Sequence, residues 1–245
     1  MARQPRILDE PSPPPQPGQT PPGPRQRVPW VGWTIILSCV AMAFLAKGLP
    51  LVSSDPEAIE LAQAGHPLAL YGPLVQRGEY WRMLTCAFEH GGPLHLLFNM
   101  SVVYTLGFML ERAIGSWRFL GLSVVTCLGS SAFALFFNFN EFTVGASGMI
   151  LGWAGAMVPI ATRQGRKELG FWLVQIAVIS ALPSILDLPI SISWAGHLGG
   201  FLFGLPCGIA LRLGGPVYKR ALPLILFITA VVAMFAAHPE RRGGF

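Results

Sequence analysis

The chain has 245 residues, of which 52% are hydrophobic and only 12% carry a charge. Because soluble domains contain roughly 25% charged residues, this composition excludes an ordinary soluble globule and favours a membrane protein. The net charge of +5 does not indicate nucleic-acid binding, since the basic residues are scattered in short polar breaks and form no continuous stripe.

The chain opens with a proline-rich segment, residues 1–29, that has no apolar stretch. We expect this segment to be a disordered, solvated tail. The first apolar block follows at about residues 30–49 and is long enough to cross a membrane. It lies too far from the start of the chain for a cleaved secretory signal, so we expect the span to be retained.

Six more apolar blocks follow, near residues 94–110, 119–137, 148–161, 169–186, 192–213 and 221–237. The pattern predicts an all-α polytopic membrane protein with seven spans. The alternative for the last block is a helix that lies on the membrane surface. The predicted divisions are the tail (1–29), a six-helix core (30–213), and a linker, a seventh helix and a short tail (214–245).

Lysine and arginine collect at one side of these spans: in the tail, at Arg112 and Arg118, at residues 163–167 and at residues 212–220. Basic loops stay in the cytoplasm, so we expect the N-terminus inside and the C-terminus outside, in the cytoplasmic membrane of a bacterium. Arg241 and Arg242 conflict mildly with this orientation.

Polar side chains within the apolar blocks are candidates for chemistry, because such groups persist at membrane depth mainly where they pair or line a wet cavity. They are His95 with Asn99, Ser147, and His197. Each alone has an ordinary explanation as a packing serine, a hydrogen-bonded histidine or an amide that joins helices. Their combination favours a catalytic site.

Ser147 lies in Gly145-Ala146-Ser147-Gly148, at the start of the fourth block. We expect it at or just inside a helix N-terminus in the outer half of the membrane, where free N–H groups favour negative charge. This position suits a nucleophile that passes through an oxyanion intermediate.

His197 shares one helix face with three glycines of the sixth block, Gly200, Gly204 and Gly208. A glycine face lets helices approach closely, and the fourth block offers small residues at 154 and 155. The fourth and sixth spans run in the same direction. We therefore expect the imidazole to reach the hydroxyl of Ser147 and to act as its base.

His95 and Asn99 are four residues apart and lie on one face of the second span, so they should reach the depth of the Ser147–His197 pair. Their side chains are donors of the kind that an oxyanion hole needs. The competing interpretation is a metal site formed by His90, His95 and His197. No carboxylate or cysteine supports it at a familiar spacing, and we expect neither a metal nor a cofactor.

Several motifs occur in one order along the chain. They are Trp81-Arg82, His90, His95 and Phe98-Asn99-Met100; Glu111 with Gly115 and Arg118-Phe119; Gly145-Ala146-Ser147-Gly148; and His197-Leu198-Gly199-Gly200 with Gly204. As a set, over residues 80–208, they resemble the rhomboid family of intramembrane serine proteases. The extra C-terminal span resembles the six-plus-one arrangement known in that family.

The resemblance implies a serine endopeptidase that cleaves the transmembrane helices of other membrane proteins near the outer face, with membrane lipid as its surroundings. It implies Ser147 as nucleophile, His197 as base without a third acid, and His95, Asn99 and the Ser147 amide as oxyanion donors. The implied supporting residues are Trp81, Arg82, His90, Gly145, Gly148 and Gly200; Arg82 and His90 match positions that organise the outer loops.

Two positions depart from the family pattern. Leu151 stands where members often have an aromatic residue that packs on the base histidine, and residues 183–189 lack aromatics that could form a lateral gate. The alternative function is a rhomboid-like protein that binds or escorts membrane helices without cutting them. Such a protein would be expected to lack the serine or the histidine.

Overall fold

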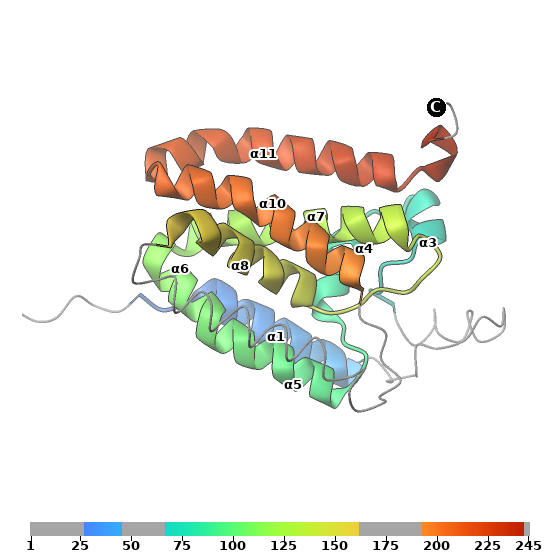
Figure 1. Ribbon diagram of the computed structural model, residues 1–245. Helices are drawn as coiled ribbons and strands as arrows, with labels where there is room; N and C mark the ends of the chain where they lie inside the picture. The colour runs from blue at the N-terminus through green and yellow to red at the C-terminus, as the bar shows by residue number, and fades with distance from the viewer. Residues whose placement is uncertain (1–26, 46–66, 162–192, 243–245) are drawn as a thin grey trace, which may run out of the picture.

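The computed structural model describes residues 27–45, 67–161 and 193–242 (Figure 1). The fifth predicted span, the basic cluster at 163–167 and the loop at 183–189 lie outside the described residues. Within the described ranges nearly all regular structure is helical, and the β structure is one isolated bridge between Leu70 and Thr143. The prediction of an all-α polytopic membrane protein is confirmed.

The helices follow the predicted order. They are α1 (Trp30–Leu45), α3 (Gly72–Gln76), α4 (Arg82–Thr85), a 3-10 turn (Cys86–Phe88), α5 (Pro93–Val102), a π turn (Val103–Gly107), α6 (Phe108–Ile114), α7 (Ser116–Phe137), α8 (Ser147–Ile160), α10 (Trp194–Arg212), α11 (Gly215–Ala236) and a 3-10 turn (Pro239–Arg242). The short helices α3 and α4 lie between the first and second apolar blocks, where the sequence analysis predicts no helix.

Four helical segments are long and apolar enough to cross a membrane: Pro93–Ile114, Ser116–Phe137, Trp194–Arg212 and Gly215–Ala236. The first combines α5, the π turn and α6. Helices α1 and α8 are apolar but shorter, and α8 has only 14 residues. A helix of that length extends about 21 Å, less than the roughly 30 Å of bilayer hydrocarbon, so at least one end of α8 lies within the membrane.

Helices α8 and α10 form the centre of the bundle. Helix α10 packs on α8 and on α7, and α7 also contacts α11. Helix α1 packs against α5, the π turn and α6 on the other side (Figure 1). The catalytic candidates Ser147 and His197 thus come from the two helices at the centre.

The glycine face of α10 packs directly on the backbone of α8. A Cβ built on Gly200, Gly204 or Gly208 would overlap the carbonyl group of Gly148, Gly152 or Ala156, respectively. These three partners are themselves four residues apart, so a ridge of α8 carbonyls lies in the groove that the glycines leave open. Gly155, predicted to flank the contact, would overlap the carbonyl of Phe201. The predicted close approach of the two helices is confirmed.

Glu111 joins α1 to the end of α6, a role that the sequence analysis missed. Its side chain is only 1% exposed. One carboxylate oxygen accepts from Val31 N at 3.0 Å and from Ser116 Oγ at 2.6 Å, and the other accepts from Gly32 N at 2.8 Å. A carboxylate is favourable here because the first N–H groups of α1 lack helical partners and carry partial positive charge.

Helix α11 extends along the whole bundle. At its start, Tyr218 Oη donates to Arg118 O at 3.0 Å beside the beginning of α7. Past its end, Gln76 Nε2 donates to Glu240 Oε2 at 2.7 Å beside α3 (Figure 1). A helix lying on one membrane surface would not join both ends of the bundle, so the arrangement favours the seventh span over the surface alternative.

We predict that Gly204→Ala lowers stability by about 1–3 kcal/mol, because the added methyl overlaps a backbone carbonyl that can move only with α8. Thermal unfolding of the purified protein in detergent measures this. The matched control is Gly121→Ala in α7, whose methyl would lie 2.6 Å from Leu222 Cδ2, the end of a flexible side chain. Equal melting temperatures for Gly204→Ala and the parent protein would contradict the packing argument.

Candidate active site

Ser147 and His197 form a hydrogen-bonded pair. Ser147 is the first residue of α8, and His197 is the fourth residue of α10. The distance between Ser147 Oγ and His197 Nε2 is 2.7 Å, and the pair is partly buried. This is the geometry in which an imidazole can take the proton of a hydroxyl.

The N-terminus of α8 points free amide groups toward this pair. Ala146 is the N-cap residue and makes no side-chain cap, and the helical ladder begins with Ile150 N donating to Ala146 O at 2.9 Å. The amides of Ser147, Gly148 and Met149 therefore have no partner within the helix. Such groups favour negative charge beside the serine.

Gly145 allows the chain to turn into α8 while His95 lies against it. Its φ of +112° is a backbone conformation that residues with a side chain rarely adopt. A Cβ at this position would also lie 2.6 Å from His95 Cε1 and 2.8 Å from His95 Nε2. The amide of Gly145 donates to Cys86 O at 2.9 Å, which ties the turn to the segment after α4. Glycine is therefore needed at position 145 for two reasons: it permits this backbone conformation, and it leaves room for the His95 ring.

The segment before Gly145 is held by the loop that leads into α3. Leu70 and Thr143 exchange two backbone hydrogen bonds of 2.9 Å, and Gly72 N donates to Phe139 O at 3.0 Å. The rings of Tyr71 and Phe142 stack with centroids 4.4 Å apart. The loop before Ser147 is therefore fixed by a segment about 70 residues earlier in the chain, which sequence spacing does not reveal.

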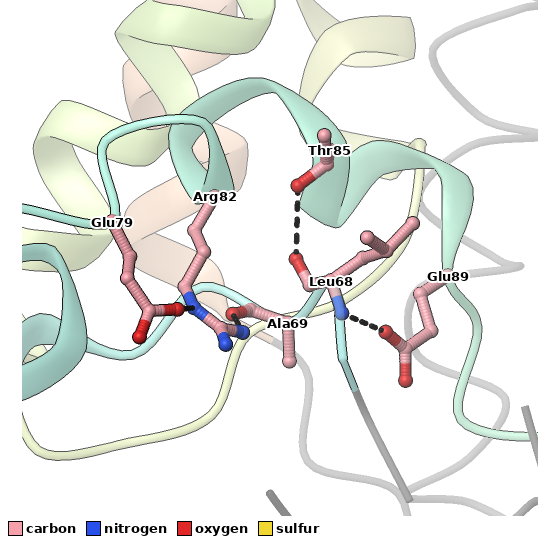
Figure 2. A network of polar contacts seen from close by, with 6 residues as sticks. All are labelled: Leu68, Ala69, Glu79, Arg82, Thr85 and Glu89. Atoms are coloured by element: carbon pink, nitrogen blue, oxygen red, sulfur yellow. Dashed lines mark hydrogen bonds and ion pairs between the residues drawn. The ribbon is translucent and has the colours of Figure 1, made fainter. Parts of the chain in front are cut away.

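Arg82 stabilises the segment around Leu70 through hydrogen bonds (Figure 2). Its Nε donates to Glu79 Oε2 at 2.7 Å and its Nη1 donates to Ala69 O at 2.8 Å. The side chain is 9% exposed, so these bonds lie largely out of water. Its neighbour Trp81 is 54% exposed and contributes backbone: its carbonyl accepts from Leu84 N and Thr85 N at 2.9 Å each.

Glu89 completes the network, and the sequence analysis did not single it out. It is 1% exposed, and its Oε2 accepts from Leu68 N at 2.9 Å (Figure 2). Thr85 Oγ1 donates to Leu68 O at 3.4 Å from the other side. The sequence signal that could have identified Glu89 is an acidic residue directly before His90 in a largely apolar chain. Its acceptor role depends on a backbone amide that only the fold brings near.

Asn99 and His95 lie on one face of α5, as predicted, but part of their hydrogen bonding is internal. Asn99 is 4% exposed, and its Nδ2 donates to His95 O at 2.9 Å. A side-chain amide has two N–H donors, so one remains. In the described structure neither side chain is hydrogen-bonded to Ser147, although α5 does contact α8.

His90 packs edge-on against His95, with ring centroids 5.1 Å apart. Both ring nitrogens of His90 and Nδ1 of His95 are buried without a protein partner. Burial, followed by the neighbouring His95, lowers the pKa of His90 to about 3, so its imidazole is neutral at physiological pH. The described residues contain no group of three His, Cys, Asp or Glu side chains placed to hold a metal ion.

Comparison with known proteins identifies the family. The model of the rhomboid domain matches residues 77–213, more than half of the chain. RHOMBOID-like protein 5 of Arabidopsis thaliana is 28% identical over 249 residues, which cover 85% of this chain and 76% of that protein.

Two bacterial proteins named as proteases are also similar. Rhomboid protease GluP of Bacillus subtilis (strain 168) is 33% identical over 163 residues, covering 65% of this chain but only 32% of GluP. Rhomboid protease AarA of Providencia stuartii is 25% identical over 209 residues, covering 74% of this chain and 72% of AarA. The chain therefore belongs to the rhomboid family and is a multi-pass integral membrane protein.

Proposed function

We propose that the chain is an intramembrane serine endopeptidase that cleaves transmembrane helices of other membrane proteins near the outer face. The observation that carries the proposal is the 2.7 Å contact between Ser147 Oγ and His197 Nε2 at the N-terminus of α8. Similarity to GluP and AarA, both named rhomboid proteases, supports it.

In the first half of the reaction, Ser147 Oγ attacks the carbonyl carbon of the scissile peptide bond while its proton passes to His197 Nε2. The tetrahedral oxyanion collapses, the C–N bond breaks, and the imidazolium gives the proton to the leaving amine. Water then attacks the acyl-enzyme by the same route and releases the carboxylate and the free serine. Water is the only co-reactant.

The proposed oxyanion hole combines the amide of Ser147 with the side chains of His95 and Asn99. The Ser147 amide has no partner within α8. His95 lies against the turn before Ser147, and Asn99 keeps one N–H beyond the bond to His95 O. Because these donors are held in place before the substrate arrives, they cost little reorganisation when charge develops.

We further propose that the N-terminus and the start of α11 face the cytoplasm and that the Ser147–His197 end of the bundle faces outward. Exposed basic residues at the opposite end, such as Arg118, Lys219 and Arg220, support this orientation. The relatives come from both plants and bacteria, so the bacterial membrane expected from the sequence stays a prediction.

Ser147→Ala and His197→Ala should each abolish cleavage of a model transmembrane substrate by the purified protein, since one removes the nucleophile and the other its base. A mechanism-based serine reagent should label the parent protein and not Ser147→Ala. The control is Ser101→Ala, an exposed serine whose hydroxyl only donates to Phe98 O at 2.7 Å. Cleavage by Ser147→Ala would end the proposal, and an inert parent protein that still binds substrate would favour the non-catalytic alternative.

Asn99→Ala should reduce kcat by a smaller factor, on the order of 10²–10³ at most, with KM little changed, because it removes one oxyanion donor. Single-turnover cleavage and substrate titration measure the two effects separately. The melting temperature should be recorded alongside, because Asn99 also donates to His95 O. A rise in KM at constant kcat would show that the side chain binds substrate instead.

The orientation can be tested with cysteines introduced at either end of α11. A membrane-impermeant thiol reagent applied to intact cells should label Glu240→Cys and should not label Lys219→Cys. The four native cysteines are buried and give a low background. The reverse labelling pattern would invert the proposed topology.

A further inference from the structure

The end of the bundle opposite the Ser147–His197 pair is strongly basic. The exposed basic residues there are Arg27, Arg112, Arg118, Arg212, Lys219 and Arg220. Of the described residues at this end, Glu111 is the only acid, and its oxygens accept from the amides of α1 and from Ser116. The ion pairs found within the described ranges lie at the other end, so the basic groups here have no described counter-charge.

Two of these arginines lie near the junction of α6 and α7. Gly115 forms the junction with a φ of +86°, and a Cβ built on it would lie 3.2 Å from Arg27 Nη1 and 3.9 Å from Arg118 Nη1. Arg118 Nη1 donates to Ile114 O at 2.8 Å, which orients the group and leaves other N–H donors available. Because like charges repel at short range, two guanidinium groups that both lie this near Gly115 favour an anion beside them.

An exposed tryptophan pair lies beside the arginines in the sequence and in the fold. Trp30 opens α1 three residues after Arg27, and Trp117 directly precedes Arg118. Their rings meet edge-on with centroids 5.7 Å apart, and the residues are 44% and 76% exposed. Tryptophan collects at the level of lipid headgroups, since its ring prefers apolar surroundings while its N–H prefers water.

We infer that Arg27, Arg118, Trp30 and Trp117, here called the basic–aromatic cluster, bind the phosphate of an anionic phospholipid in the adjacent leaflet. A guanidinium donates two parallel hydrogen bonds to phosphate oxygens, and the paired positive charges prefer an anionic lipid to a zwitterionic one. The exposed tryptophans favour a lipid over a free anion, because they offer apolar surface to the acyl-chain region below the headgroup. Basic sites of this kind between transmembrane helices bind anionic headgroups.

The test is a lipid titration of the purified full-length protein in detergent, read by native mass spectrometry with phosphatidylglycerol or phosphatidylcholine as the probe. The parent protein should retain phosphatidylglycerol in preference. Arg27→Gln should weaken that binding about fivefold, the usual contribution of one interfacial basic residue. Arg27→Lys should restore part of it. The matched control is Arg220→Gln, which removes the same charge from the same end but from outside the cluster.

The outcomes distinguish a specific lipid-binding site from a general electrostatic attraction between the basic end and anionic lipids. If Arg27→Gln and Arg220→Gln lost equal amounts of phosphatidylglycerol binding, the inference would be overturned. Equal retention of the two lipids by the parent protein would overturn it too. Displacement of phosphatidylglycerol by millimolar inorganic phosphate would mean a free-anion site and would also contradict it. The readout is binding, so a Ser147→Ala background must give the same result, and the test does not depend on the proposed protease activity.

Discussion

The close approach of α8 and α10 is the constraint on which the rest of the structure depends. Three glycines of α10 leave a groove in which the carbonyl ridge of α8 lies, and no side chain separates the two backbones there. In lipid the hydrophobic effect drives helix association weakly, so packing at this distance is what holds the pair together. The first residue of one helix and the fourth of the other consequently meet in a 2.7 Å hydrogen bond.

The two ends of the bundle stabilise this centre in different ways. At the end that carries Ser147, backbone hydrogen bonds between Leu70 and Thr143 join the segment before Ser147 to the loop before α3, Arg82 holds that loop, and the buried bonds there have little competition from water. At the other end, Glu111 neutralises the partial charge at the start of α1, and Tyr218 ties α11 to α7. Both ends rely on polar groups buried with their partners, which is the arrangement that makes polar groups tolerable in an apolar protein.

The charged residues are also divided between the two ends of the bundle. The described acids apart from Glu111 lie at the end of the bundle that carries Ser147, where Arg77 is also exposed, and six exposed arginines and lysines lie at the other end. The active-site candidates, by contrast, are a hydroxyl, an amide and imidazoles, none of which carries a permanent charge.

The described apolar helices and their order followed from the sequence, because long apolar blocks leave only helices as membrane-crossing structures, and the polar residues within them were conspicuous candidates for chemistry. The glycine spacing of α10 even predicted which helices touch. Only the tertiary structure decided that α8 offers its carbonyls at 148, 152 and 156, that Glu111 caps α1 and that Leu70 pairs with Thr143. Each of those contacts joins segments tens of residues apart through at least one backbone group, which every residue possesses, and so the sequence does not mark both partners in advance.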